Sequence, residues 1–376
     1  MSVSIIIPTW NGLALLQKHL PALLAADGVG QAEIIIVDDG GGDETGAWLA
    51  AHMPQVRVIR LETNSGFSRA CNAGLRAAQG EWVVLLNNDV HVTPGFLAPL
   101  VRPLEADPDV FAVNAAILIP GKDMLDEGQK HGAFHHGLFY VDCVHDPALR
   151  ATQTAPTLYA TACAAAYRRT MLDTLGGFDE LFSPAYWEDV DLSYRALKRG
   201  WRVLYEPESI VHHEHESTTA RLDRRFLAMV RQRNHFFFVW KNIGDRRWLA
   251  ASLLLAPCVG VYQALRGEDT SLLRGLGAAL RDVRRVLVRR GVEQASACVS
   301  DRAVLAGAEE EPTPRPSRNG KGVGGVVVGP PASAVLKKKG DKEALLTPFP
   351  LREGRGVGSE SPEAGASSSA AERRDA

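Results

Sequence analysis

The chain has 376 residues, of which 45% are hydrophobic and 23% are charged, so its composition is that of an ordinary globular protein. A formal net charge of −2 lacks the basic excess that nucleic-acid-binding proteins normally carry, and we expect no nucleic-acid partner. Five scattered cysteines, without a pair at metal-ligand or redox spacing, argue against a disulfide framework and favour a reducing cytosol.

The N-terminal part of the chain alternates apolar runs with amphipathic segments. The runs predicted as β-strands are Val3–Pro8, Glu33–Val37, Val56–Leu61 and Trp82–Leu86. The segments predicted as helices are Leu13–Ala26, Thr45–His52 and Phe67–Gln79. Nearly continuous apolar strands separated by helices indicate an α/β fold, in which helices flank both faces of a mostly parallel central sheet.

Polar residues follow three of these strands, at the carboxyl edge where such sheets bind ligands. They are Pro8–Asn11, Asp38–Asp39 and Asn87–Asp89. The glycines after Asp39 permit close backbone approach, and Asp89 can bind a hard divalent cation. On these residues alone we favour an ordinary turn after a strand for Asp89, and the segment at Asp38–Asp39 can be a glycine-rich strand-to-helix turn. The chain has no G-x-G-x-x-G fingerprint and no phosphate loop ending in Gly-Lys-Ser/Thr, which weakens dinucleotide-binding and triphosphate-binding interpretations.

The segment from about 107 to 220 is more irregular and richer in polar and aromatic residues, which suits a substrate-facing half. It contains three carboxylates within four residues, and such a cluster needs a counter-ion, a shared proton or solvent. We interpret Asp191 as the cap of a helix over 191–199 that Gly200 ends. Asp189 follows Tyr186 and Trp187 in the sequence, and it is a candidate general base.

Two groups of histidines lie in the same half. His212, His213 and His215 can supply a metal ligand, and a set with one ligand is as compatible with the sequence as a set with none. We interpret the second group, from His131 to His136, as part of a solvent-facing loop.

The C-terminal part is predicted to be helical from 221 to about 290, with mixed aromatic and basic residues. That mixture is typical either of a membrane surface or of a packed helical appendage. The apolar stretch 248–265 either touches or spans a membrane, or is buried. The N-terminus lacks the features of a signal peptide, so we expect a cytoplasmic protein, at the inner face of the cytoplasmic membrane if it contacts lipid. We divide the chain into a catalytic domain (1–220), a helical region (221–305) and a tail (306–376) too polar to fold.

Taken together and in this order, the motifs resemble those of glycosyltransferase family 2, a group of inverting enzymes with a GT-A fold. The matching stretches are Ile5–Gly12, Val37–Gly40, Asn64–Gly74, Leu85–Asp89, Gly177–Glu180, Glu188–Leu192 and His212–Glu214. Each stretch alone is weak evidence, but their number, order and spacing make the resemblance specific. The detailed pattern looks most like the rhamnosyltransferase-type branch that builds bacterial surface polysaccharides.

The resemblance implies roles for individual residues. The nucleotide-binding residues would be Pro8, Thr9, Asn11, Asp38, Asp39, Asn64, Gly66, Arg69, Asn72, Asn87 and Asn88. Asp89, at the last position of the family's D-x-D motif, would bind Mg²⁺ or Mn²⁺, and His212 would approach that metal. Asp189 would be the general base, with Glu188 beside it. The sequence departs from the family pattern at Asn87, which replaces the first carboxylate and predicts modest metal affinity in the absence of donor.

The expected reaction is transfer of a sugar, such as rhamnose, from a UDP- or dTDP-sugar to a glycan or lipid-linked acceptor in cell-envelope biosynthesis. Two alternatives are a nucleotidyltransferase of similar fold and a catalytically silent nucleotide-sugar-binding protein. The first would normally carry a glycine-rich loop with Arg or Lys after the first strand, which Pro8–Gly12 lacks. The second is disfavoured because Asp89 and Asp189 are both present. Peripheral membrane contact through 221–290 is also expected.

Overall fold

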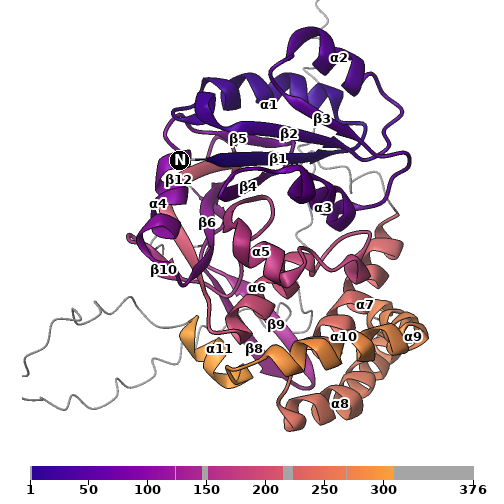
Figure 1. Ribbon diagram of the computed structural model, residues 1–376. Helices are drawn as coiled ribbons and strands as arrows, with labels where there is room; N and C mark the ends of the chain where they lie inside the picture. The colour runs from indigo at the N-terminus through magenta and orange to yellow at the C-terminus, as the bar shows by residue number, and fades with distance from the viewer. Residues whose placement is uncertain (1, 123, 146–150, 215–222, 268, 309–376) are drawn as a thin grey trace, which may run out of the picture.

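The computed structural model describes residues 2–122, 124–145, 151–214, 223–267 and 269–308. Figure 1 shows a central sheet with helices on both faces, and a group of C-terminal helices that extends to one side beneath it. The predicted tail lies almost entirely outside the described residues.

The N-terminal elements agree with the sequence predictions apart from a residue or two at their ends. The strands are β1 (Val3–Thr9), β2 (Glu33–Asp38), β3 (Arg57–Arg60) and β4 (Trp82–Leu86). The helices are α1 (Leu13–Ala25), α2 (Thr45–His52) and α3 (Phe67–Ala77), with a 3₁₀ turn, η1, at Val29–Gln31. Strand β1 pairs in parallel with β2 and β4, and β2 pairs in parallel with β3, so the predicted parallel arrangement is confirmed here.

The sheet is buried on both faces because apolar residues occupy successive positions of its strands. In β1, Ile5 and Ile7 pack in a core with α1 and α4 (Leu97–Ala106), whereas Ile6 packs in a second core with α3. Such two-sided burial is what continuous Ile and Val runs require.

The second half continues the sheet with regular strands, which corrects our expectation of a more irregular segment there. The added strands are β6 (Val110–Leu118), β11 (Ala164–Arg168) and β12 (Arg202–His213), in the order β12-β6-β11-β4. Strand β11 runs antiparallel to both neighbours, and β12 runs parallel to β6. Short strands at its margins are β5 (Val90–Val92), β7 (Leu125–Glu127) and β10 (Ala155–Pro156).

A two-stranded hairpin, β8 (Lys130–His135) and β9 (Leu138–Cys143), lies below the sheet. Two of the histidines assigned to a loop, His131 and His135, are therefore strand residues, and only His136 lies in the turn. The remaining elements of this half are α5 (Arg169–Leu175), the 3₁₀ turn η3 (Glu180–Phe182) and α6 (Glu188–Lys198).

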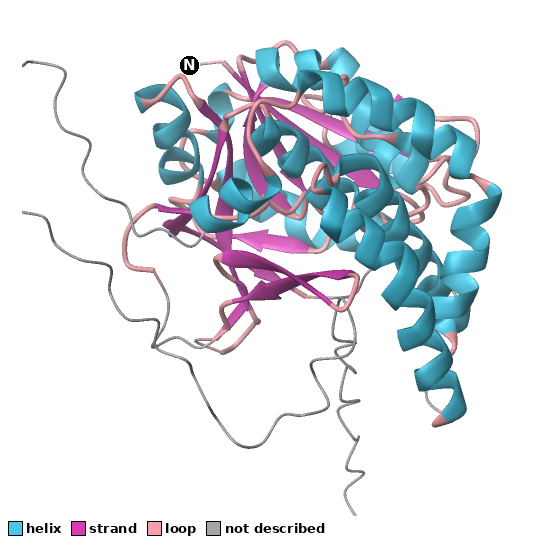
Figure 2. Cartoon of the chain, turned by 90° about the horizontal axis from the view of Figure 1, so that it is seen from below, coloured by secondary structure: helices cyan, strands magenta, loops and turns pink. Residues whose placement is uncertain are grey.

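The C-terminal region is helical, as predicted. Its helices are α7 (Arg224–Asn242), α8 (Arg246–Leu265), α9 (Ser271–Arg281), α10 (Val283–Ser296) and α11 (Asp301–Gly307). An aromatic core joins α7 to the hairpin and to the residues before α6; Phe139, Trp187 and Phe238 are members of it. Figure 2 shows the longer helices of this region projecting beyond the sheet as an arm.

Asp191 does not cap a helix, and that interpretation was wrong. Helix α6 begins at Glu188, so Asp191 lies inside its first turn and is fully buried. Its carboxylate accepts hydrogen bonds from Arg195 Nε at 2.8 Å, from Lys241 Nζ at 2.8 and 2.9 Å, and from Asn242 Nδ2 at 2.8 Å. Asp191 thus ties α6 to α7. Gly200 does adopt the predicted left-handed conformation (φ 81°) beyond the end of α6.

Candidate active site

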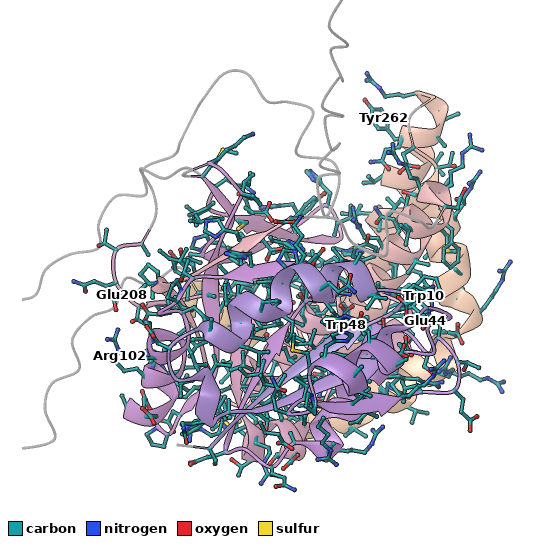
Figure 3. All side chains as sticks on the ribbon, turned by 90° about the horizontal axis from the view of Figure 1, so that it is seen from above. Trp10, Glu44, Trp48, Arg102, Glu208 and Tyr262 are labelled. Carbon is teal, nitrogen blue, oxygen red and sulfur yellow. The ribbon has the colours of Figure 1, made fainter. Side chains whose placement is uncertain are left out.

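Three loops at the carboxyl edge of the sheet are tied together by hydrogen bonds. Asn88 Nδ2, after β4, donates to Thr9 Oγ1 at 2.8 Å, and the Asp39 amide donates to the Thr9 carbonyl at 2.8 Å. Asn11 has a φ of 49°, and its Oδ1 accepts from the Gly42 amide at 2.7 Å. The structure therefore brings the predicted residues of the first, second and fourth strands together at one edge. Trp10 and Glu44 lie on the same side of the molecule in Figure 3.

The two aspartates after β2 organise the neighbouring backbone. Asp38 is fully buried, and its Oδ1 accepts from the Gly41 amide at 2.9 Å. Asp39 accepts from the amides of Ser65 and Gly66 at 2.7 and 2.9 Å, so it shapes the loop that contains Asn64 and Gly66. Burial raises the pKa of Asp39. Gly66 has a φ of 88°, and a Cβ there would lie 3.2 Å from Pro184, which explains the glycine.

Helix α3 connects this loop to the segment that leads to α6. Asn72 forms two hydrogen bonds with Phe178: its Nδ2 donates to the carbonyl and its Oδ1 accepts from the amide, both at 2.9 Å. Arg69 Nε donates to Glu180 Oε2 at 2.8 Å on the surface. In this arrangement Asn72 and Arg69 join two motifs, and their contact with a nucleotide stays a prediction.

Asp89, almost completely buried, lies beside a histidine. His213 Nε2 is 3.2 Å from Asp89 Oδ1, and His213 Nδ1 is 3.6 Å from Asp126 Oδ2. Antiparallel pairing of β5 with β12 creates this contact, because it places His213 opposite Val90. Successive strand residues face opposite sides, so His212 instead packs near His91, with ring centroids 6.4 Å apart. The structure thus brings His213, and not the predicted His212, against Asp89.

The side chains around Asp89 are compatible with a metal site that has few protein ligands, which is the kind of site expected when Asn87 replaces a carboxylate. Within the described ranges, no group of three His, Cys, Asp or Glu side chains is placed to hold a metal ion. Asp89 offers one carboxylate and His213 one imidazole, and magnesium or manganese accepts few protein ligands when phosphate oxygens and water complete its shell. The residues present therefore suit a cation that arrives with a diphosphate.

The Glu188–Asp189 pair opens α6 after two non-glycine residues in the left-handed region, Tyr186 and Trp187, each with φ 74°. Glu188 is buried, and its Oε2 has no hydrogen-bond partner in the described part of the chain. Burial and the adjacent Asp189 raise the pKa of Glu188 well above its usual range. Burial and the nearby Glu127 raise the pKa of Asp189 to about 6. A carboxyl group with a pKa raised in this way is a candidate general base.

Three charged residues that the sequence analysis missed lie around these two carboxylate sites. Asp126 contacts His213, while Glu127 and Lys130 act on Asp189 from β7 and β8. Lys130 is fully buried; its Nζ lies 3.2 Å from Glu127 Oε2 and 4.8 Å from the Tyr159 ring centroid. Its charge favours the ionised form of Asp189. A buried lysine next to isolated acidic residues has no motif, so only the tertiary structure reveals it.

Helix α7 holds the backbone before Glu188 in its left-handed conformation. The fully buried Asn234 places Nδ2 at 2.6, 2.9 and 2.9 Å from the carbonyls of Phe182, Ala185 and Tyr186. Arg233 Nη2 donates to the Ser183 carbonyl at 2.5 Å. The guanidinium of Arg231 lies 4.4 Å from the Tyr186 ring centroid. Helix α7 therefore positions the segment before Glu188. The sequence analysis missed this role because the side chains of α7 bond to backbone carbonyls about 50 residues away in the sequence.

Comparisons with known proteins bear on this geometry. Residues 4–176 match the family model described as glycosyl transferase family 2. The chain is similar to a pre-mycofactocin glycosyltransferase of Mycobacterium tuberculosis, at 27% identity over 74% of this chain and 61% of that protein. It is also similar to the N-acetylglucosaminyl-diphospho-decaprenol L-rhamnosyltransferase of the same organism, at 28% identity over 62% of this chain and 84% of that protein.

The fold has a counterpart among solved structures. GalNAc-T7, solved with UDP, GalNAc and Mn²⁺, superposes with a TM-score of 0.60 at 19% identity over 81% of this chain and 56% of that chain. The chain therefore has the predicted GT-A fold, with a mixed sheet, flanking helices and a helical C-terminal region.

Proposed function

We propose that the chain, whose residues 4–176 match the family model described as glycosyl transferase family 2, is an inverting glycosyltransferase of cell-envelope polysaccharide biosynthesis. The donor would be a UDP- or dTDP-sugar, with rhamnose as the favoured sugar, and the acceptor would be a glycan or a lipid-linked saccharide. The relative named as a rhamnosyltransferase, whose name includes a diphospho-decaprenol, supports this choice.

One observation carries the proposal. Asp189, whose pKa is raised to about 6, lies in the first turn of α6 near Glu127 of β7, and the adjacent β7 residue Asp126 contacts the same His213 as the buried Asp89. A transferase that inverts in one displacement needs a base for the acceptor hydroxyl and a separate site for the departing diphosphate. Asp189 and Asp89 supply these two groups from different elements.

Asp189 Oδ2 would accept the proton of the acceptor hydroxyl as its oxygen attacks the anomeric carbon, while Oδ1 keeps its hydrogen bond from the Val190 amide at 2.8 Å. Glu188 would stay protonated beside it, because burial and the charge of Asp189 oppose its ionisation. The loops of Thr9, Asn11 and Asp39 would bind the nucleoside.

Asp89, together with His213, would hold a divalent cation, and this imidazole replaces His212 in the proposal. Bound there, Mg²⁺ or Mn²⁺ would neutralise charge on the diphosphate leaving group. Asp126 would orient His213 through Nδ1, an arrangement common among metal-binding histidines.

The test is release of nucleoside diphosphate from a panel of nucleotide sugars, with and without Mg²⁺ or Mn²⁺, in the presence of saccharide acceptors. We expect metal-dependent release with one or a few donors and its loss in Asp89→Ala. Formation of pyrophosphate from a nucleoside triphosphate and a sugar 1-phosphate, without release of nucleoside diphosphate from any nucleotide sugar, would identify a nucleotidyltransferase and overturn the proposal. Donor binding by calorimetry without any turnover would favour the silent binding protein.

A further inference from the structure

Helix α8 turns its apolar side to solvent and its small and polar residues inward. The exposed residues form a stripe at helical spacing: Leu254, Leu255, Cys258, Val261, Tyr262 and Leu265. Leu265 is 82% exposed and Leu254 is 70% exposed. The buried face consists of Ser252, Ala256, Gly260 and Gln263. An amphipathic helix of a water-soluble protein has the opposite arrangement, so the stripe indicates a surface that is covered by an apolar partner.

The buried face of α8 is fixed in the molecule. Gly260 packs on α9 so closely that a Cβ would lie 2.8 Å from Leu273, and a Cβ on Gly137, in the hairpin turn, would lie 2.3 Å from the Ala251 carbonyl. In mean hydropathy, 1.6, α8 is apolar enough to cross a membrane. A crossing helix would have to leave these contacts, whereas a helix that lies flat keeps them and immerses only the stripe.

Arginines flank the stripe at both ends. Arg246 and Arg247 begin α8, and Arg266 follows it. Just beyond, the N-terminal ends of α7 and α9 form an open cavity of about 380 Å³ whose lining includes Arg224, Arg225 and Arg274. No ion pair joins these three arginines to a carboxylate within the described ranges, and Asp269 in the same cavity hydrogen-bonds to Ser271 instead.

We propose that α8 docks flat on an anionic lipid bilayer, with the stripe among the acyl chains and the arginine cavity against phosphate headgroups. The charge pattern selects this occupant, because an apolar band bordered by arginines matches a surface of acyl chains covered by phosphates. A second copy of the chain would present the same arginines and repel them.

Docking in this way places the site close to the bilayer. Helix α7 extends from the cavity at Arg224 to Asn234, which holds the backbone before Glu188, a span of roughly 15 Å at helical rise. A lipid-linked acceptor could remain in the bilayer while its sugar reached Asp189. This last step rests on the proposed function, but the docking itself does not. Figure 3 shows Tyr262 near the end of the helical arm, away from Trp10 at the nucleotide edge.

The first experiment is cosedimentation of the full chain with vesicles of equal parts phosphatidylcholine and phosphatidylglycerol, at low salt. We expect binding that falls by at least about 100-fold in Leu254→Glu/Val261→Glu, since each substitution removes an apolar side chain from the acyl chains and adds a charge there. The matched control is Val58→Glu, an exposed apolar position on β3, which should bind like the wild type. Replacing Arg224, Arg225 and Arg274 by Gln should weaken binding to these vesicles on the order of 100-fold, and should have little effect on the weak binding to phosphatidylcholine alone.

A second measurement locates the bilayer without relying on mutated apolar residues. Cys258 lies in the stripe and Cys298 is exposed elsewhere, so each can carry an environment-sensitive fluorophore while the other is replaced by Ser. We expect a blue shift on vesicles for the label at Cys258 and none at Cys298.

Several outcomes would overturn the inference: no binding of the wild type, unchanged binding in the Leu254→Glu/Val261→Glu variant, or membrane retention at high pH, which marks a crossing helix. A dimer in sedimentation that this variant dissociates, without vesicle binding, would identify a second copy as the occupant. If the protein binds vesicles but has no transferase activity, the docking proposal holds and the proposed function fails. If it is active but does not bind vesicles, only the docking proposal is refuted.

Discussion

The acidic segment from Asp179 to Asp191 contains two regions that look alike in sequence and differ in surroundings. Glu188 is buried and Asp189 is half-buried, both beside other carboxylates, and desolvation raises the pKa of each. Asp191, in the same helical turn, is bonded by Lys241, Arg195 and Asn242. Asp179 belongs with Asp191: burial opposes its ionisation, yet the Lys241 ammonium holds its pKa below the usual range.

We call Glu188 and Asp189 the reactive region, and Asp179 and Asp191, which are bonded by cations, the anchoring region. A buried carboxylate that is matched by cations is stable only as an ion pair, and removing either partner is costly. A desolvated carboxylate without a bonded cation has a raised pKa, and a pKa closer to the working pH makes it a better general base. The role of a carboxylate in this segment therefore follows from the cations bonded to it and not from its position in the sequence.

The largest expected effect is on the reactive region. Asp189→Asn should lower kcat by roughly 10²–10⁴-fold, because the acceptor hydroxyl loses its base, and it should leave donor binding unchanged. It should also raise the free energy of unfolding at neutral pH, since a partly desolvated charge disappears. Kinetics and urea unfolding measure the two effects. Asp173→Asn, on the exposed surface of α5, is the control. Full activity of Asp189→Asn would refute the assignment of the base.

The anchoring region should respond in the opposite way. Lys241→Met should lower the free energy of unfolding by about 3–5 kcal/mol, because it leaves two buried carboxylates without their shared cation. Adding Asp191→Asn should recover part of this loss. Urea titration of the single and double variants gives the values, and a loss below the error of the measurement would contradict the paired character of this region.

A third substitution probes how anchoring supports the reactive pair. Asn234→Ala removes the donor to the carbonyls before Glu188 and should cost about 1–3 kcal/mol in the free energy of unfolding. The loosened backbone should lower kcat by up to about 10²-fold with little change in KM for the donor. A change confined to stability would mean that Asn234 does not position the pair.

The smallest effect is the pH dependence. Since the pKa of Asp189 is raised to about 6, the folded protein binds this proton more tightly than the unfolded chain does. The contribution of Asp189 to the free energy of unfolding therefore falls as the pH rises from 3.8, its usual pKa, to about 6. The rate of sugar transfer, which needs the ionised carboxylate, should rise with pH over a transition whose midpoint is near 6. Lys130→Met should move this midpoint to higher pH, whereas a midpoint unchanged by the substitution would exclude the influence of Lys130 on the base.

The sequence predicted the N-terminal half of the fold well because β1, β2 and β4 are continuous apolar runs bounded by turn residues. It failed for the central strand β11, whose run of alanines carries little strand signal. At the site, the types of residue were predictable, but the face of the strand on which each side chain lies was not. Whether His212 or His213 lies beside Asp89 depends on the pairing of β12 with β5. The contacts of Asp191 and Lys130 arise only from tertiary packing.

The ion pairs of Lys241 have a thermodynamic consequence for the molecule as a whole. Because they bury charges shared by α6 and α7, neither the sheet half nor the helical half can melt alone without exposing an unmatched carboxylate or ammonium in the part that stays folded. The described chain should therefore unfold in a single cooperative calorimetric transition. Any molecule that binds the native state at one end, a nucleotide at the sheet edge or a bilayer at α8, should then raise the melting temperature of both ends together.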